Sequence, residues 1–400
     1  MERTNKYPFL KKILNYKFWG IVLLIGVLLQ LYGFYKYSYH SFTIFSGILF
    51  LSVLWWLIYF FVRNKSVKTK LVVNSVFIAL LVAEILLRFI GSTSTYMERR
   101  VGFYESSYNL KNASYWINRN NKKISKTGEE FNFYRECNSM GYSDKEWNWK
   151  DMKSKTRILA LGDSFTEGDG ADADSTWVKF LERKIKDTSF YFMNGGICGS
   201  DPVFELYKLQ HIFLQFKPDI VVVCINYSDI QDVLFRGGYE RFTPDGVRFK
   251  RGPWWEPIYA MSHFSRLFFR LKFNQSLIAY KAYDKEKEKS LSIIKTTIDS
   301  IKQLSDNNSI KSVFVFHPMK ESVKEDKNPF KEVIEELNDE DIPTINLFEY
   351  YSKPEIVNNI NDYYWVKDGH HNAKGYKLMA EGIYEGFFEH YILIYEKLNN

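Results

Sequence analysis

The sequence predicts an α/β protein with a five-stranded parallel sheet, preceded by three transmembrane helices. Two observations lead to this prediction: three long apolar runs in the first ninety residues, and a regular alternation of short apolar runs with helical patterns after residue 155. Such alternation is typical of a parallel sheet covered by helices on both faces. We expect a membrane anchor over residues 1–91, a connecting segment over 92–155 packed on the main domain, and that domain over 156–400.

The three apolar runs cover residues 18–34, 42–62 and 71–90 and contain almost no charge. Each is close to the roughly 20 residues that a helix needs to cross the hydrocarbon core of a bilayer. A cleaved signal peptide explains the first run poorly, because no small-residue cleavage pattern follows it. The other alternative, buried helices of a soluble core, would need a partner to cover three helices that are hydrophobic all round. The pattern therefore favours a membrane anchor.

The charges between these runs predict their orientation. The loop between the first and second runs offers only Lys36, whereas the other two flanks are basic. These basic residues are Arg3, Lys6, Lys11, Lys12 and Lys17 before the first run, and Arg63, Lys65, Lys68 and Lys70 before the third. By the positive-inside rule these flanks are cytoplasmic, so the chain after Ile90 is expected to be extracytoplasmic.

The formal net charge of +7 over 400 residues is modest and lies partly in those loops. No compact basic stripe with interleaved aromatic residues is present, so nucleic-acid binding is not expected. The three cysteines show no paired metal spacing, and we expect neither a metal nor another cofactor. Cys224 lies in a strand pattern and is expected in the core. A disulfide bond between Cys137 and Cys198 is left open.

Five apolar runs predict the strands, and four longer patterns predict helices between them. The strands are expected at 158–161, 190–193, 220–225, 313–316 and 344–347, and the helices at 177–185, 203–215, 285–304 and 331–337. An insertion at about 233–282 interrupts this alternation and contains a hairpin signal at 243–247. Its aromatic and basic residues suit either a lid or membrane-facing surface that binds a carbohydrate or acyl chain, or an insertion with its own small core. We favour the second interpretation.

The first predicted strand ends in Gly162, Asp163 and Ser164. A residue that follows such a strand lies at the carboxyl edge of the sheet, where open α/β folds place their sites. A serine hydroxyl becomes a useful nucleophile when a base takes its proton and a third group orients that base. Asp368 and His370 lie together just before the last helical pattern, so both are expected at the same edge.

Three blocks of the sequence resemble one family. Residues 162–168, Gly-Asp-Ser-Phe-Thr-Glu-Gly, resemble the first block of the SGNH/GDSL hydrolases, which are serine esterases and acyl-transfer enzymes with a flavodoxin-like three-layer α/β/α fold. Residues 368–376 resemble the terminal Asp/His block of this family, and residues 193–201 resemble its glycine block. Residues 138–142, Asn-Ser-Met-Gly-Tyr, are similar to a stretch found upstream in membrane-tethered members. The resemblance covers roughly residues 138–390.

The resemblance implies a catalytic triad in which Ser164 is the nucleophile, His370 the base and Asp368 the residue that orients the base. The spacing to the following Asn372 and Gly375 selects His370. The commoner three-residue step from the aspartate selects His371, which remains the alternative base.

The oxyanion hole is where the sequence departs from the family. The resemblance implies donors from the backbone N–H groups of Ser164 and Gly199. A further block of the family, at the end of the third strand, usually reads Gly-x-Asn-Asp, and its asparagine is a further donor. This chain has Ser228 at the asparagine position and Asn226 at the glycine position. Either Ser228 or Asn226 could complete the hole.

We therefore expect a membrane-anchored extracytoplasmic serine esterase that acts on an acyl ester of a cell-envelope glycan or lipid. An envelope O-acyltransferase and a non-catalytic glycan- or lipid-binding protein with the same fold are the alternatives. The membrane-spanning segments could also bind a partner in an envelope-synthesis complex.

Overall fold

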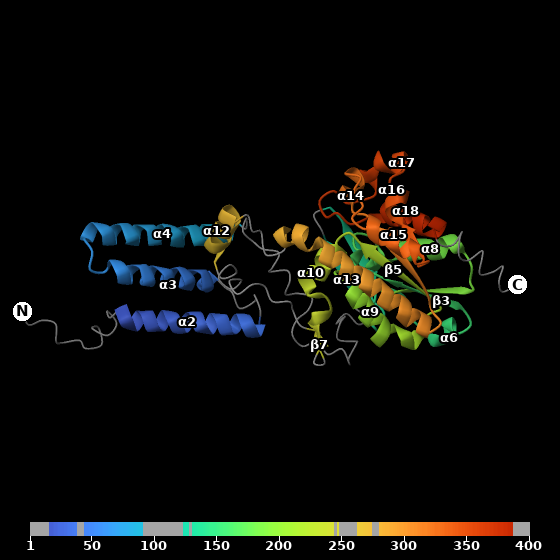
Figure 1. The fold of residues 1–400 in the computed structure, drawn as a ribbon, viewed down its shortest axis with the longest axis horizontal. Coiled ribbons are helices and arrows are strands. Elements are labelled where there is room, and N and C mark those ends of the chain that lie inside the picture. Colours follow the sequence, from blue (N-terminus) through green and yellow to red (C-terminus); the bar gives the residue numbers. More distant parts are fainter. Residues whose placement is uncertain are drawn as a thin grey trace, which may run out of the picture. The chain divides into compact units, whose positions relative to one another are not determined.

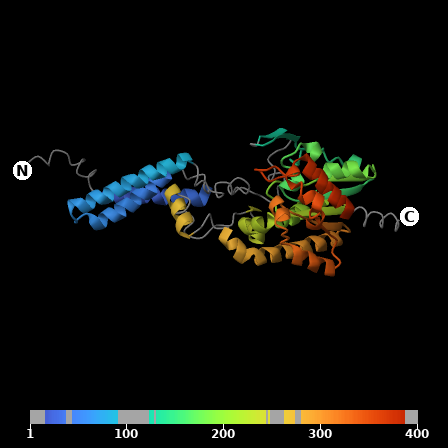
Figure 2. The same ribbon diagram turned by 90° about the horizontal axis from the view of Figure 1, so that it is seen from above.

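A computed structural model describes residues 16–37, 44–90, 123–127, 130–243, 246–247, 262–273 and 280–386. The chain divides into two compact units (Figures 1 and 2). The first unit consists of Met1–Ser106 with Phe249–Asp284, and the second of Ser107–Arg248 with Lys285–Asn400. Much of the insertion thus groups with the N-terminal helices. Residues 92–122 of the expected connecting segment, and the insertion residues 248–261 and 274–279, lie outside the described residues.

Three long helices form the N-terminal part of the first unit, where the apolar runs predicted them. They are α2 (Tyr16–Tyr37), α3 (Ile44–Val62) and α4 (Val67–Ile90), and α3 packs on both others. Among the described residues one helix, Val67–Leu87, is long and apolar enough to cross a membrane, while Gly20–Tyr32 and Ser46–Val62 are shorter apolar stretches. Three membrane crossings remain a prediction.

Polar side chains connect these apolar helices in pairs. The Ser46 hydroxyl donates to Gln30 Oε1 at 2.8 Å, and Trp55 Nε1 donates to Asn74 Oδ1 at 3.0 Å. Apolar side chains face outward, with Leu29 and Phe61 exposed by 64% and 75%. The helices therefore satisfy polar groups internally and present apolar groups to their surroundings.

The second unit contains the predicted five-stranded parallel sheet. Its strands are β3 (Thr156–Leu161), β4 (Phe190–Asn194), β5 (Ile220–Asn226), β8 (Lys311–His317) and β9 (Thr344–Asn346), in the order β4-β3-β5-β8-β9. The pairing of β5 with β8 places Asn226 beside His317 at the carboxyl edge. Cys224 is buried in β5, as predicted, and the three cysteines, all within the described ranges, form no disulfide bond with one another.

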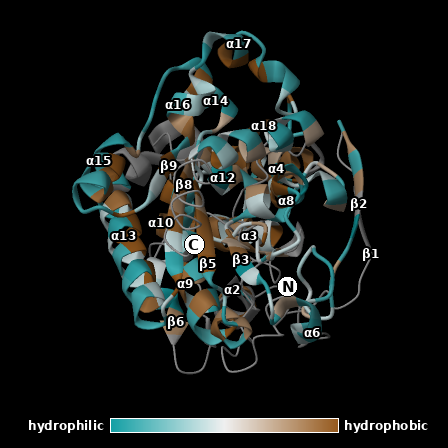
Figure 3. Ribbon diagram, turned by 90° about the vertical axis from the view of Figure 1, so that its right-hand side faces the viewer, coloured by the Kyte–Doolittle hydropathy of each residue, from teal (hydrophilic) through white to brown (hydrophobic). Residues whose placement is uncertain are grey.

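Helices cover both faces of this sheet. Ile158 and Ala160 of β3 join a core cluster with α8 and α18, whereas the alternate residues Leu159 and Leu161 are buried on the opposite face. Figure 3 shows α9 and α13 on that second side of β5, and its colours show β5 and β8 as hydrophobic. The larger helices of this unit are α8 (Trp177–Ile185), α9 (Pro202–His211), α10 (Asp229–Arg236), α13 (Tyr280–Asn307), α15 (Lys331–Asp339) and α18 (Ala373–Ile383).

Short helices complete the connections. They are α6 (Trp149–Met152), α7 (Ser164–Glu167), α14 (Lys320–Lys324), α16 (Leu347–Tyr351), α17 (Pro354–Val357) and the 3₁₀ turns Ala173–Ser175, Phe213–Phe216, Gly238–Arg241 and Ile360–Asp362. The helix expected over 203–215 ends at His211, and a 3₁₀ turn continues it. In the insertion, the signal at 243–247 forms the antiparallel pair β6 (Phe242–Thr243) and β7 (Gly246–Val247), followed by α12 (His263–Phe273).

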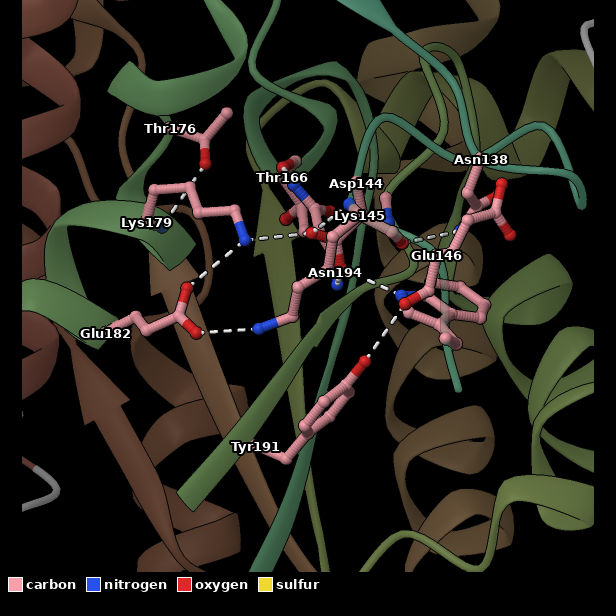
Figure 4. A network of polar contacts seen from close by, with 12 residues as sticks. Asn138, Asp144, Lys145, Glu146, Thr166, Thr176, Lys179, Glu182, Tyr191 and Asn194 are labelled. Atoms are coloured by element: carbon pink, nitrogen blue, oxygen red, sulfur yellow. Dashed lines mark hydrogen bonds and ion pairs between the residues drawn. The ribbon is translucent and has the colours of Figure 1, made fainter. Parts of the chain in front are cut away.

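The described part of the connecting segment packs on the sheet. It opens with the antiparallel pair β1 (Lys123–Thr127) and β2 (Asn132–Glu136). Further on, Asp144 accepts a hydrogen bond from the Asn194 N–H at 2.8 Å and forms an ion pair with Lys179 at 2.9 Å (Figure 4). Asn194 in turn donates from Nδ2 to the Thr166 carbonyl at 2.9 Å. The segment thus braces the end of β4, and through it the turn that follows Ser164.

The apolar stripe of α13 provides a test of this packing. Ile294, Ile298 and Ile301 are fully buried at helical spacing. We expect Ile298→Ala to destabilise the second unit by about 2–4 kcal/mol and to lower its unfolding temperature by roughly 5–10 °C. Tryptophan fluorescence during heating measures this. Thr296→Ala, at an exposed position two residues away, is the matched control, and equal shifts in the two variants would contradict the packing.

Candidate active site

Ser164 lies in the turn that follows β3, which pairs with β4 and β5. It is the first residue of α7, and Asp163 caps that helix by accepting the Phe165 N–H at 2.9 Å. This cap starts a helical turn at once, ahead of the helix that the sequence predicted at 177–185. Ser164 is 7% exposed. The strand and the cap together place its hydroxyl at the carboxyl edge of the sheet.

His370 and Asp368 form a line of hydrogen bonds with Ser164. His370 Nε2 lies 2.7 Å from Ser164 Oγ, although 206 residues separate the two in sequence. His370 Nδ1 lies 2.5 Å from Asp368 Oδ1. Because a carboxylate only accepts hydrogen bonds, Nδ1 carries the proton and Nε2 is left to accept the serine hydroxyl. This is the arrangement in which an imidazole can remove a proton from serine.

The charges around His370 make it a stronger base than an ordinary histidine. Burial lowers the pKa of His370, but the hydrogen bond to Asp368 and the negative charges of Asp169, Asp368 and Asp163 raise it more, so the net change is upward. The hydrogen bond from His370 in turn is the main cause that lowers the pKa of Asp368. Asp368 is therefore ionised and able to stabilise an imidazolium.

Asn226 and Ser228 follow β5 at the same edge but lie in different surroundings. Asn226 is fully buried, and its Oδ1 accepts the Ser228 N–H at 2.9 Å while its Nδ2 donates to His317 Nδ1 at 3.0 Å. The Ser228 hydroxyl is half-buried and lies 3.1 Å from Asn226 Oδ1 and 3.3 Å from Asp163 Oδ2. The amide of Asn226 is thus used inside the protein, whereas Ser228 lies beside the residue that precedes Ser164.

Gly199 lies in the turn after β4. The turn is closed by the Ser200 N–H donating to the Ile197 carbonyl at 2.9 Å, and Gly199 has φ +75°, a conformation that favours glycine. The Cys198 N–H donates to the Glu167 carboxylate. Because Glu167 belongs to α7, this contact ties the glycine turn to the helix that begins at Ser164.

A comparison with solved structures finds proteins that resemble part of this chain. The chain is structurally similar to GDSL-family esterases. A Desulfitobacterium hafniense protein described as lipolytic and of the G-D-S-L family is 14% identical, with 58% of this chain and 100% of that chain covered and a TM-score of 0.37. A psychrotrophic esterase from a Pseudoalteromonas species is 15% identical, with 62% and 100% covered and a TM-score of 0.37.

A two-domain esterase active on acetylated mannans is also similar, at 14% identity, with 59% of this chain and 50% of that chain covered and a TM-score of 0.36. No family model matches the chain. A Mycoplasma pneumoniae protein described as uncharacterized is 34% identical over 89 residues, which is 20% of this chain. The match spans 10% of the length of that relative.

His371, the alternative base, points away from Ser164 into the interior. It is fully buried, and its Nδ1 donates to the Tyr363 carbonyl at 2.8 Å. Its Nε2 lies 2.9 Å from His317 Nε2 and 3.0 Å from the Tyr351 hydroxyl. Burial is the main cause that lowers the pKa of His371 to about 3, so this ring is neutral and accepts hydrogen bonds at Nε2.

The hydrogen bonds of this buried group have one consistent direction. Asn226 donates to His317, His317 donates to His371, and His371 donates to a backbone carbonyl. Burial also lowers the pKa of His317 well below the usual range. His317 is therefore a neutral residue of the interior, and its Nδ1 orients Asn226 by accepting a hydrogen bond from the side-chain amide.

Two residues that the sequence reasoning missed support the Asp368 loop. The N–H groups of Lys367 and Asp368 donate to Glu130 Oε2, the second at 2.9 Å. Trp365 Nε1 donates to the Gly170 carbonyl at 2.9 Å. Glu130 precedes its partners by more than 230 residues and belongs to no motif, so only the folded chain reveals it.

Within the described ranges, no group of three or more His, Cys, Asp and Glu side chains could hold a metal ion. The chemistry available at this edge is that of a serine, a basic histidine and an oriented carboxylate.

The raised pKa of His370 predicts the pH dependence of serine reactivity. Protonated His370 cannot accept the proton of Ser164, so labelling by a fluorophosphonate should fall as the pH drops through the pKa of His370. Because this pKa is raised, the fall should begin at a higher pH than for an ordinary histidine. Asp368→Asn removes one cause of the raised His370 pKa and should move the fall in labelling to lower pH. If labelling falls at the same pH in Asp368→Asn as in the wild type, the role assigned to Asp368 is contradicted.

Proposed function

We propose that this chain is a membrane-anchored extracytoplasmic serine esterase that acts on an acyl ester of a cell-envelope glycan or lipid. The observation that carries the proposal is the line of hydrogen bonds from Ser164 through His370 to Asp368, at 2.7 and 2.5 Å. The first distance lies within the range in which a base can take a proton from a nucleophile, and the second is a hydrogen bond that orients the base. The non-catalytic alternative would leave this geometry without a purpose.

The reaction follows from this line in two halves. Ser164 Oγ attacks the ester carbonyl while His370 Nε2 takes the hydroxyl proton, and the tetrahedral intermediate then expels the alcohol, which receives that proton from His370. The acyl group is left as an ester on Ser164. Water attacks this ester with His370 again as the base, and the acid is released as Ser164 regains its proton. Asp368 stays ionised throughout and holds the imidazole in one tautomer.

The oxyanion that forms on the carbonyl needs donors that are already in place. We assign this role to the backbone N–H groups of Ser164 and Gly199 and to the Ser228 hydroxyl. The N–H of Ser164 opens α7, where the first amide groups have no partner within the helix. Ser228 is preferred over Asn226 because the Asn226 amide is already bound to Ser228 and His317. The Ser228 hydroxyl can rotate from Asp163 toward the substrate.

The membrane part of the proposal rests on three features of the N-terminal helices. Val67–Leu87 has the length and composition of a membrane span, and the neighbouring helices α2 and α3 carry outward-facing apolar side chains. By the positive-inside rule, the basic flanks support a location outside the cytoplasm for the sequence after Ile90. An enzyme held there meets the acyl esters of the envelope. An O-acyltransferase would use the same first half-reaction and differ only in replacing water by a second alcohol.

Hydrolysis is tested with the full-length chain in detergent, a fluorophosphonate probe and an aryl acetate. Ser164→Ala and His370→Ala should each reduce turnover by roughly 10⁴-fold or more while the protein stays folded. His371→Ala should instead lower the unfolding temperature, because it removes a buried and hydrogen-bonded side chain, and should leave the activity of the folded fraction largely intact.

The exposed Ser189→Ala is the matched control for the serine replacement. If folded wild-type protein neither reacts with the probe nor turns over the ester, the esterase proposal fails. If His371→Ala and not His370→Ala abolishes turnover, the base has been assigned wrongly.

Ser228 is tested separately. We expect Ser228→Ala to lower kcat by roughly 10²–10³-fold with little change in KM, because the lost donor acts on the transition state. Ser228→Asn restores the residue type that the family uses and should retain most of the activity. Loss of less than about threefold in Ser228→Ala would assign the third donor elsewhere.

A further inference from the structure

A buried carboxylate in the first unit joins the insertion to the apolar helix α4. Glu84 accepts hydrogen bonds from the Ser262 hydroxyl at 2.8 Å, the Phe264 N–H at 2.9 Å and the His263 N–H at 3.1 Å. Glu84 is fully buried, although 178 residues separate it from Ser262. The N–H groups that open α12 have no partner within that helix, and a negative charge is favourable at this end. Glu84 therefore caps α12 from another helix.

The surroundings of Glu84 are shaped for this contact. Gly47 of α3 faces the carboxylate so closely that a Cβ atom at this position would lie 2.0 Å from Glu84 Oε1. Only glycine leaves room for the side chain. The Ser262 hydroxyl also accepts a hydrogen bond from the Ser265 N–H at 3.2 Å, so Ser262, the residue before α12, is its N-cap. Helices α3, α4 and α12 thus meet at one carboxylate.

The described side chains of α12 show an apolar face turned outward. His263, Ser265 and Arg266 are buried, whereas Phe264 and Leu267 are half-buried and Phe268 is 50% exposed. A helix on the surface of a soluble protein shows the opposite pattern, with its polar face in water. Exposed apolar patches of this kind are typical of contact with a membrane or a partner.

The same outward apolar character continues on α4 around Glu84. Val82 and Leu86 are exposed by 50% and 53%. Helix α12 lies against α4 near the C-terminal end of α4 and is inclined to its axis (Figures 1 and 2). Glu84 precedes Leu87, the last residue of the apolar span, by three residues, or about 4.5 Å along the helix. Helices that lie in the plane of a membrane bury their apolar faces to a depth of about 5–10 Å.

We propose that α12 is an in-plane membrane helix, held by Glu84, whose outward face of Phe264, Leu267 and Phe268 binds the acyl chains of the outer leaflet. This inference rests on the membrane anchor of the proposed function. It selects lipid over a partner protein because the apolar face of α12 is continuous with that of the predicted span. The insertion then gives the sheet-forming part of the chain a second attachment to the membrane, in addition to the end of α4.

The test measures how deep residue 268 lies in lipid. Phe268→Cys in a Cys198→Ser background carries an environment-sensitive fluorophore, and the full-length chain is reconstituted in phosphatidylcholine and phosphatidylglycerol vesicles with nitroxide-labelled acyl chains. Ile78→Cys on α4, exposed by 60%, is the reference for the span, and Glu332→Cys on α15 is the reference for water. We expect nitroxide quenching at 268 to be several-fold greater than at 332 and comparable to that at 78.

The references separate the two proposals. If 78 is quenched and 268 behaves like 332, the in-plane helix is wrong while the anchor stands. If 78 is not quenched either, the membrane anchor itself fails, and this inference fails with it.

Glu84 is tested in the same labelled protein. Glu84→Ala should reduce quenching at 268 to the level of 332, because α12 loses its cap, and should leave quenching at 78 unchanged. Asn74→Ala on the same helix, which removes the contact to Trp55, should change neither. Unchanged quenching at 268 in Glu84→Ala would overturn the role of Glu84 in holding α12.

Discussion

The hydrogen bond between Ser164 and His370 is the contact on which the rest of the site depends. It joins the first strand of the sheet to the loop before the last helix, 206 residues away. Two orientations must hold at once for its 2.7 Å distance to form: the Asp163 cap turns Ser164 outward, and the Asp368 loop presents His370. Glu130 fixes that loop through its backbone N–H groups. The geometry is thus set by residues that do not react.

The carboxyl edge of the sheet carries several buried polar groups, among them Asn226, His317 and His371. A buried polar group is costly unless it is hydrogen-bonded. His317 and His371 meet this condition as neutral rings in a one-way chain of donors that starts at Asn226. These hydrogen bonds hold the amide of Asn226 inside the protein, while the Ser228 hydroxyl lies beside Asp163, which precedes Ser164. Burial also raises the pKa of Asp163 to about 6, against the hydrogen bond from Phe165 and the charge of His370.

The insertion shows how one segment can belong to a unit other than the one that encloses it in sequence. It leaves the sheet-forming part after β7, and α12 then packs on α4, where Glu84 caps it. The favoured interpretation of the insertion, a separate small core, does not describe the α12 part, because its buried polar face meets α4. Among the described side chains of α12, Phe264, Leu267 and Phe268 are half-buried or exposed, as apolar residues of α4 are.

The sequence by itself determined the elements and the candidate residues. Strand and helix positions follow from local periodicity, and the hairpin at 243–247 follows from turn chemistry, so both can be predicted from neighbouring residues. The position of Ser164 after a strand and of Asp368 before a helix predicted a shared edge for the same reason.

Only the tertiary structure decided which of two adjacent histidines faces Ser164, because neighbouring residues differ in direction and the packing around His371 selects the inward one. It also decided the orientation of Asn226, the support from Glu130 and the capping of α12 by Glu84. Each of these depends on partners far away in sequence, and no local pattern encodes a contact between side chains that meet only after folding.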